Sequence, residues 1–134
     1  MSRLFTLRIK IYYEDTDFTG SVYYANYLRF FERGRSEAMG TERLSRDYDE
    51  LGVGLVVYKA DLTFLKPARY GDEIEVRSRA HAEGDHRLVF DQQLFKNDGP
   101  QPLVKGIIQL AQVDREGRLM PLRDWIKARA AETG

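Results

Sequence analysis

Two carboxylates and the segment that follows them are the residues of this chain best placed to do chemistry. Asp15 and Asp17 stand at the end of an alternating, strand-like segment, and a short loop containing Gly20 leads to a one-sided helical pattern. This order puts an acidic side chain close to a helix N-terminus, where free backbone N–H groups and the helix dipole favour negative charge. A carboxylate facing such an oxyanion-stabilising helix end is an arrangement that acyl transfer can use.

A structural explanation competes for each of these residues. Asp side chains at the end of a strand commonly cap turns or interact with the next helix. In an extended segment, residues two apart point to the same side, so spacing alone does not separate Asp15 from Asp17. Asn26 opens the helical pattern and is a good N-cap residue type. From the residues alone, both roles stay open.

The helix that must present this site is predicted over 25–39. At about 100° per residue, Tyr27, Phe31 and Gly34 share one apolar stripe, and polar residues fill the opposite arc. A glycine there costs about 1 kcal/mol of helix propensity, so Gly34 is expected to let the helix approach a sheet closely. Arg35 falls on the apolar side, and its stem is expected to lead the charge outward to water.

Most of the remaining chain shows the period-two alternation of half-buried strands. The predicted strands cover 5–13 before the helix and 55–65, 73–82, 88–96 and 103–113 after it. In the first strand after the helix, one face is read as Val56, Tyr58, Ala60, Leu62 and Phe64. A short helical turn is expected over 43–51 and a terminal helix from Pro121 through Trp125.

This order of elements predicts the fold class. Five strands joined mostly by hairpins, with one long helix after the first, favour an α+β domain in which the helix packs on an antiparallel sheet. A chain of 134 residues is long enough for one core, so a single domain over 1–134 is expected.

Composition excludes several functional classes. Lys plus Arg and Asp plus Glu number 21 each, which argues against a dedicated nucleic-acid binder. The absence of cysteine excludes a thiol nucleophile and a Cys-based zinc site. The two histidines, His81 and His86, lie in or beside one predicted hairpin. The sequence contains no metal-ligand cluster, no phosphate loop and no nucleophile-elbow serine. No metal or cofactor is therefore expected.

The chain also lacks membrane and export signals. No run approaches the about 20 apolar residues that span a bilayer, and the first ten residues alternate instead of forming a signal peptide. A cytoplasmic location without an integral membrane segment is therefore expected.

One stretch carries a resemblance to a known family. It reads Asp17-Phe18-Thr19-Gly20-Ser21-Val22-Tyr23-Tyr24-Ala25-Asn26-Tyr27. It is similar to the active-site motif of the 4-hydroxybenzoyl-CoA thioesterase family, which belongs to the hotdog-fold superfamily, and is closest to its Tol–Pal-associated acyl-CoA thioesterase branch. Residues 32–37 and the Pro-Ala-Arg turn within 66–72 resemble further stretches of that branch.

The resemblance implies a five-stranded sheet wrapped around one central helix, and hydrolysis of an acyl-CoA thioester. It assigns Asp17 as the catalytic carboxylate, acting as general base or nucleophile, and the backbone N–H of Tyr24 as the donor that polarises the thioester carbonyl. Gly20 matches the loop glycine, and Asn26 and Tyr27 match the start of the central helix; all three count as substrate-binding candidates. Alternatives are an aroyl-CoA thioesterase for a hydroxylated benzoyl group, and a non-catalytic module that holds an acyl carrier or a protein.

The resemblance also implies a homo-oligomer, usually a dimer of dimers, because the family's cleft lies between subunits. CoA phosphates need cations, and Lys59, Lys66 and Arg87 are candidates by position, with Tyr58 as a further pocket candidate. Many members of the branch have His in place of Tyr24 and a second glycine or alanine where this chain has Phe18-Thr19, so Phe18 adds bulk beside the catalytic carboxylate.

Overall fold

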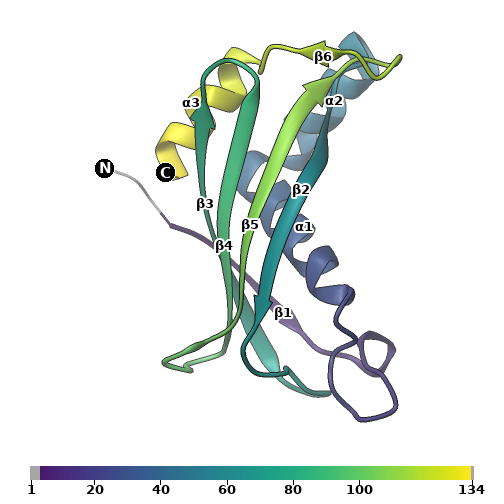
Figure 1. Ribbon diagram of the computed structural model, residues 1–134, viewed down its shortest axis with the longest axis vertical. Coiled ribbons are helices and arrows are strands. Elements are labelled where there is room, and N and C mark those ends of the chain that lie inside the picture. The colour runs from purple at the N-terminus through teal and green to yellow at the C-terminus, as the bar shows by residue number, and fades with distance from the viewer. Residues whose placement is uncertain (1–3, 134) are drawn as a thin grey trace.

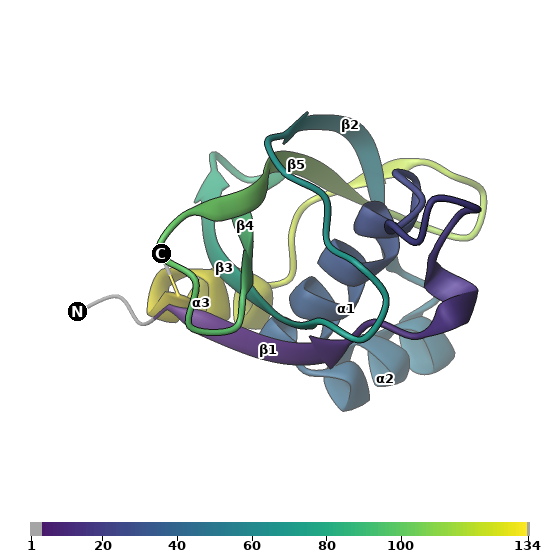
Figure 2. The same cartoon turned by 90° about the horizontal axis from the view of Figure 1, so that it is seen from below.

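The computed structural model describes residues 4–133, in which a curved antiparallel sheet encloses one helix on its concave side (Figures 1 and 2). The elements, in chain order, are β1 (Phe5–Lys10), the 3₁₀ turn η1 (Tyr13–Asp15), α1 (Asn26–Met39), α2 (Thr41–Leu51), β2 (Gly54–Phe64), β3 (Glu73–Glu83), β4 (Arg87–Lys96), β5 (Pro102–Val113), β6 (Leu119–Met120) and α3 (Asp124–Thr133).

The sheet runs in the order β1-β3-β4-β5-β2, and β6 pairs with β5; every pairing is antiparallel. The α+β class and the antiparallel sheet expected from the sequence are confirmed, but the sheet has six strands instead of five. The extra strand β6 is two residues long, too short for a period of two to be recognised. The described residues also form three α-helices, because the short turn expected near 43–51 is a helix of 11 residues and α3 continues to Thr133.

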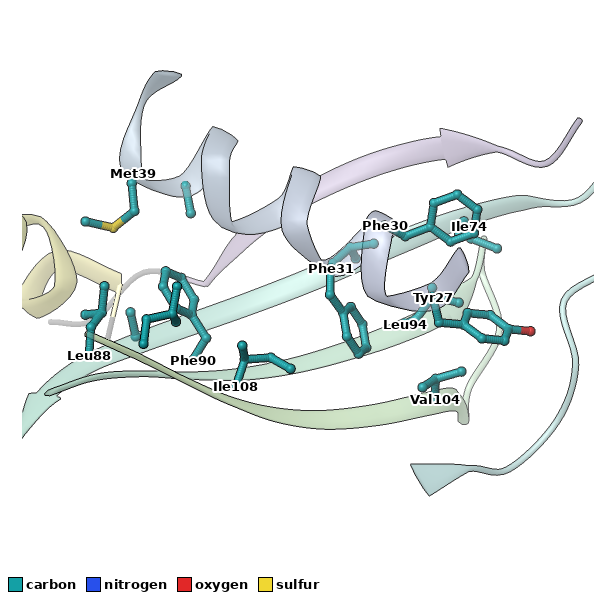
Figure 3. Packing of buried hydrophobic residues seen from close by; sticks show 14 of the residues in the cluster. Tyr27, Phe30, Phe31, Met39, Ile74, Leu88, Phe90, Leu94, Val104 and Ile108 are labelled. Carbon is teal, nitrogen blue, oxygen red and sulfur yellow. The ribbon is translucent and has the colours of Figure 1, made fainter. Parts of the chain in front are cut away.

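Helix α1 fills the concave side of the sheet. Tyr27, Phe30 and Phe31 are at most 3% exposed and face side chains of β3, β4 and β5 (Figure 3). Each fully buried side chain of this size contributes about 1.5–3 kcal/mol relative to exposure. A Cβ added to Gly34 would lie 2.8 Å from Val76 Cγ1, closer than real contacts allow. The close approach of helix and sheet that was expected at Gly34 is therefore confirmed.

The expectation that Arg35 leads its charge outward is wrong. Arg35 is only 9% exposed, and its Nη1 donates to Oε1 of Gln92 at 3.2 Å. Gln92 is itself 0% exposed and donates to the Phe31 carbonyl and the Ser78 hydroxyl, both at 2.9 Å. A polar group of β4 thus meets the guanidinium inside the sheet, which the pattern of α1 alone does not reveal.

A β-bulge in β2 changes which residues face α1. Val57 pairs with Leu110 and Lys59 with Gln109, so Tyr58 is the extra residue. Leu62 and Phe64 face the helix beyond the bulge, whereas Val57 does so before it. The sequence interpretation that put Val56 and Tyr58 on one face with Leu62 and Phe64 is therefore wrong.

The two edges of the sheet differ. Beside β1, helix α3 packs on β3, and the Thr133 hydroxyl accepts the backbone N–H of Ala80 at 3.0 Å, just beyond the last β1–β3 pair. Within residues 4–133, no strand pairs with the outer edge of β2. None of the helices in the described part is long and apolar enough to cross a membrane.

Candidate functional site

The segment between β1 and α1 is a folded loop and not a continuation of the strand. The strand ends at Lys10, and a 3₁₀ turn follows. The Asp15 carboxylate accepts the backbone N–H of Tyr12 at 2.9 Å, and the Asn26 side-chain amide donates to the Asp15 carbonyl at 2.9 Å. Asp15 therefore has a local structural role, and the expectation of two aligned carboxylates on an extended segment is wrong.

Asp17 is held through one of its two carboxylate oxygens. Oδ1 accepts the Thr19 backbone N–H at 2.8 Å and the Thr19 hydroxyl at 2.5 Å. In residues 4–133, Oδ2 accepts no hydrogen bond. The Thr19 hydroxyl, the Thr19 N–H and the positive charge of Arg69 together hold the pKa of Asp17 below its ordinary value. The carboxylate is thus oriented, ionised at neutral pH and open on one oxygen.

Arg69 fastens the loop that carries Asp17. Its Nη1 donates to the Ser21 hydroxyl and its Nη2 to the Thr19 carbonyl, both at 3.1 Å. Gly20 lies between these two residues with φ +82°, and an added Cβ would lie 3.3 Å from Arg69 Nη2. Gly20 is thereby explained by backbone conformation and by the closeness of the guanidinium.

Sequence reasoning gave no role to Thr19 or Arg69. For Thr19 a local signal exists, because an Asp that binds the backbone two residues on is a common turn pattern. For Arg69 there is no local signal, since its partners lie 48 and 50 residues away in the chain.

The loop closes so that Asp17 lies beside the chain leading into α1. The Asp17 N–H donates to the Ser21 carbonyl at 2.9 Å, and Thr16 forms an isolated bridge with Val22. Two residues after Val22, the chain enters the first turn before the helix at Tyr24. Asp17 and the helix N-terminus therefore flank one small loop.

The N-terminus of α1 keeps open donors. The N–H groups of Asn26, Tyr27 and Leu28 donate to carbonyls three residues back, at 2.8–3.3 Å. Among the described residues, no protein atom accepts the N–H of Tyr24 or Ala25. The N-cap is Ala25, without a side-chain cap, so Asn26 does not act as the N-cap. Two backbone N–H groups at the positive end of the helix dipole are free to bind a developing oxyanion.

Tyr27 lies in the core. It is 3% exposed, its hydroxyl accepts the Ala68 N–H at 2.9 Å, and burial raises its pKa. Tyr27 therefore joins α1 to the turn that carries Arg69, and the structure gives it a positioning contact and not an open surface.

The other expected binding residues lie elsewhere. Tyr58 donates to Gln109 Oε1 at 3.0 Å, and Arg87 pairs with Glu83 at 3.0 Å close to Tyr58. Lys59 pairs with Gln109 in the register, so all three lie on the face of the sheet opposite α1.

Distance separates these residues from the helix N-terminus as well. The Tyr24 ring meets Phe64, at 6.1 Å between ring centres. Tyr58 precedes Phe64 by six residues, or about 20 Å of strand. One chain therefore does not bring Tyr58, Lys59 or Arg87 to Asp17. Lys66 lies beyond the end of β2 and not on it.

Neither histidine joins a metal site in the described part of the chain. His81 Nε2 lies 3.1 Å from Glu83 Oε1 on the exposed face of β3. Within residues 4–133, no three His, Cys, Asp or Glu side chains gather in a way that could hold a metal ion. The chemistry that the site offers is that of one carboxylate and one helix N-terminus.

Known proteins resemble most of this chain. The thioesterase-like superfamily matches residues 12–130. The acyl-CoA thioesterase YbgC of Haemophilus influenzae is 31% identical over 120 residues, covering 88% of this chain and 86% of the relative. The acyl-CoA thioester hydrolase YbgC of Escherichia coli is 35% identical over 92 residues, covering 68% and 69%. A 1,4-dihydroxy-2-naphthoyl-CoA thioesterase from Synechocystis superposes with a TM-score of 0.88 over 97% of both chains, at 21% identity.

Proposed function

This chain belongs to the thioesterase-like superfamily, has its hotdog fold and is an acyl-CoA thioesterase, and we propose that Asp17 and the N-terminus of α1 carry out the hydrolysis. The observation that supports this most is the unequal state of the two Asp17 oxygens. Oδ1 is held by Thr19 and Oδ2 is open, and the loop that carries Asp17 leads into a helix end with free N–H groups at Tyr24 and Ala25.

In the proposed reaction, the thioester carbonyl oxygen accepts the Tyr24 N–H, which stabilises the negative charge of the tetrahedral intermediate. Asp17 either takes a proton from the attacking water or attacks the carbonyl carbon itself to form a mixed anhydride that water then hydrolyses. The CoA thiol has a pKa of about 8.5, so it departs as a thiolate without a strong general acid. The products are the free acid and CoA.

The substitution Asp17→Asn tests the assignment, with Asp15→Asn as its matched control. Asp17→Asn keeps the size of the side chain but removes the base and nucleophile, so kcat should fall by about 10²–10⁴. Its unfolding midpoint should stay the same or rise, since functional sites often sacrifice stability. Asp15→Asn weakens a turn and should act mainly on stability, with a smaller loss of rate.

Both variants are compared on the best substrate from a screen of acyl-CoA thioesters of graded length, aromatic ones included. A folded Asp17→Asn enzyme with near-normal turnover would show that another group supplies the base or nucleophile.

Finer points of the function are also proposals. We propose that the chain belongs to the Tol–Pal-associated branch, on the motif resemblance, and that it prefers acyl-CoA to aroyl-CoA; the relatives of 31–35% identity, which are named acyl-CoA enzymes, support the second point. The 4-hydroxybenzoyl type of substrate is the alternative, on the same residues. We propose one thioesterase domain over 1–134 and a cytoplasmic location.

We further propose a homo-oligomer, a dimer of dimers, with the cleft between subunits. The open edge of β2 supports this, because long unpaired edges are normally covered in native proteins. In such an assembly the residues that one chain leaves far from Asp17, namely Tyr58, Lys59 and Arg87, could reach CoA bound at a partner's site.

A further inference from the structure

A cavity of about 320 Å³ lies between the C-terminal half of α1, helix α2 and the start of β2. Most of its wall is apolar, with side chains from α1, α2, β2 and β5 and from the segment between α2 and β2: Met39, Leu44, Leu55, Val57, Leu110 and Val53. A cavity of this volume and lining is typical of pockets that hold small molecules. It is separate from the loop that carries Asp17.

One cation in this wall lacks a counter-ion. Arg35 is 9% exposed and donates only from Nη1, to Gln92. Among residues 4–133, no carboxylate oxygen lies within 4.0 Å of its guanidinium, and no fully buried side-chain nitrogen lacks a hydrogen-bond partner. The other N–H groups of Arg35 therefore open into the cavity. A charge removed from water in this way is costly unless it meets an acceptor.

Two acidic residues also line the cavity, and both have partners. Asp47 Oδ2 accepts Arg123 Nε at 3.1 Å and Trp125 Nε1 at 2.8 Å. Glu32 is exposed to water and accepts the Ser36 hydroxyl at 2.7 Å. Burial lowers the pKa of Arg35 and the charge of Glu32 opposes this, but Glu32 forms no ion pair with it. The group left to bind a ligand is the cation.

The cavity lies further along α1 than the proposed oxyanion donor. Tyr24 lies two residues before α1 and Arg35 follows it by eleven residues, so at 1.5 Å per residue the two are about 16 Å apart along the helix axis. Leu28 lies between them in the chain and is 44% exposed. An acyl chain whose thioester carbonyl meets the Tyr24 N–H has to span this distance along α1 for its far end to reach Arg35.

We propose that Arg35 binds a carboxylate at the far end of a long acyl chain, so that this enzyme prefers CoA thioesters of long dicarboxylic acids. The proposal rests on the thioesterase function proposed above. A guanidinium binds a carboxylate through paired charge-assisted hydrogen bonds, and the apolar wall accommodates the methylene chain in front of it. The carboxylate takes no part in the hydrolysis and serves only recognition.

The test compares kcat/KM for tetradecanoyl-CoA with that for the mono-CoA thioester of tetradecanedioic acid. The wild-type enzyme should favour the second. Arg35→Met should lower kcat/KM for the carboxylated substrate by about ten- to a hundredfold, the typical worth of a hydrogen bond to a charged group, and leave the plain one nearly unchanged. Arg35→Lys should retain part of the preference. Adipoyl-CoA and hexanoyl-CoA are too short to reach Arg35 and should be unaffected.

Arg33→Met is the matched control, because it removes an exposed cation from the same helix. It should leave kcat/KM unchanged for both the plain and the carboxylated substrate. An Arg35→Met enzyme that loses both long substrates equally, or whose unfolding midpoint falls sharply, would assign Arg35 a purely structural role and overturn the proposal. A wild-type enzyme that hydrolyses acyl-CoA but disfavours the carboxylated chain would also overturn it while leaving the thioesterase function intact.

Binding of free tetradecanedioate, measured by calorimetry, distinguishes a failure of the proposed catalytic function from a failure of the proposed Arg35 site. If the wild-type protein hydrolyses no acyl-CoA but binds the diacid and the Arg35→Met variant does not, the proposed catalytic function fails and the binding site stands. If neither protein binds the diacid and the two substrates are hydrolysed alike, the site proposed here is wrong.

Discussion

Thr19 is the residue that sets both the orientation and the charge of the proposed catalytic carboxylate. Its hydroxyl and N–H bind the same Asp17 oxygen, at 2.5 and 2.8 Å, and this leaves the other oxygen for the reaction. Hydrogen bonds to an ionised carboxylate stabilise the charged form, so they lower its pKa. Arg69 supports the arrangement by fastening the carbonyl of Thr19.

Thr19→Val should move the acidic limb of the pH–rate profile to higher pH. The Thr19 hydroxyl is the largest cause of the lowered Asp17 pKa, so its removal raises that pKa towards the ordinary value. As the solution is acidified, the ionised form of Asp17 is then lost at a higher pH than in the wild type. The decline in kcat/KM therefore begins at a higher pH. Activity at neutral pH should fall less than in Asp17→Asn, because the carboxylate remains.

Thr16→Val serves as the control for this experiment. Thr16 lies in the same loop, but its hydroxyl donates to the Tyr13 carbonyl at 2.7 Å and does not touch Asp17. Its acidic limb should coincide with that of the wild type. If Thr19→Val coincides as well, the Thr19 hydroxyl does not control the ionisation of Asp17 during the reaction.

At the scale of elements, the fit between α1 and the sheet decides where the site lies. Gly34 lets the helix approach β3 so closely that a Cβ would meet Val76, Ser78 and Gln92 at 2.8–3.2 Å. This contact holds the helix against the sheet. It thereby also fixes the position of the free N–H groups at the N-terminus of the helix. In β2, the bulge at Tyr58 changes the direction of the side chains, so Tyr58 and Lys59 point to the face of the sheet opposite α1.

Gly34→Ala should destabilise the protein, although alanine is the better helix former. Alanine gains about 1 kcal/mol of helix propensity, but overpacking a close contact typically costs about 1–3 kcal/mol. The net loss should appear as a lower midpoint of denaturant unfolding at an unchanged m-value.

Glu37→Ala, at an exposed position of the same helix, should stay within about 0.5 kcal/mol of the wild type. A Gly34→Ala protein more stable than the wild type would mean that the sheet yields to a methyl group at this position.

At the scale of the whole molecule, the sheet ends in two unlike edges. Helix α3 covers β3 beyond the end of β1, whereas the outer edge of β2, which is 11 residues long, has no strand neighbour in the described part of the chain. Val56 and Val57 are 44% and 45% exposed at this edge, and Phe64 and Leu65 are about half exposed. An unpaired edge with apolar side chains is a template for another chain.

We therefore expect a homodimer through β2, and light scattering at micromolar concentration should give at least twice the chain mass. Val56→Lys should weaken the assembly, because edge lysines oppose strand pairing, and activity per chain should fall on dilution if the cleft is shared. Leu119→Lys changes another exposed apolar residue, on β6, which pairs with β5 on the side opposite β2, and should have no such effect. A fully active monomer would rule out a cleft between subunits.

The order of apolar, polar and glycine residues along the chain was enough to predict a large part of the fold and the candidate catalytic residue. Apolar spacing predicted the extent of α1 to within one residue, since the period of 3.6 is imposed by the helix itself. Alternation predicted most of the strands and the antiparallel class, and Gly34 within an apolar stripe predicted the close helix–sheet contact. The loop motif singled out Asp17, which the structure supplies with an anchored and an open oxygen.

Only the tertiary structure decided which partners those residues meet. The sequence of α1 predicted that Arg35 reaches water, because its hydrogen-bond partner Gln92 lies 57 residues further along the chain and cannot be recognised from the helix pattern. The bulge at Tyr58 depends on the register with β5, and the role of Arg69 depends on a turn folding against the Asp17 loop. A backbone preference is set by neighbours in sequence, whereas a side chain's counter-charge, acceptor or cavity is set by the element that folds against it.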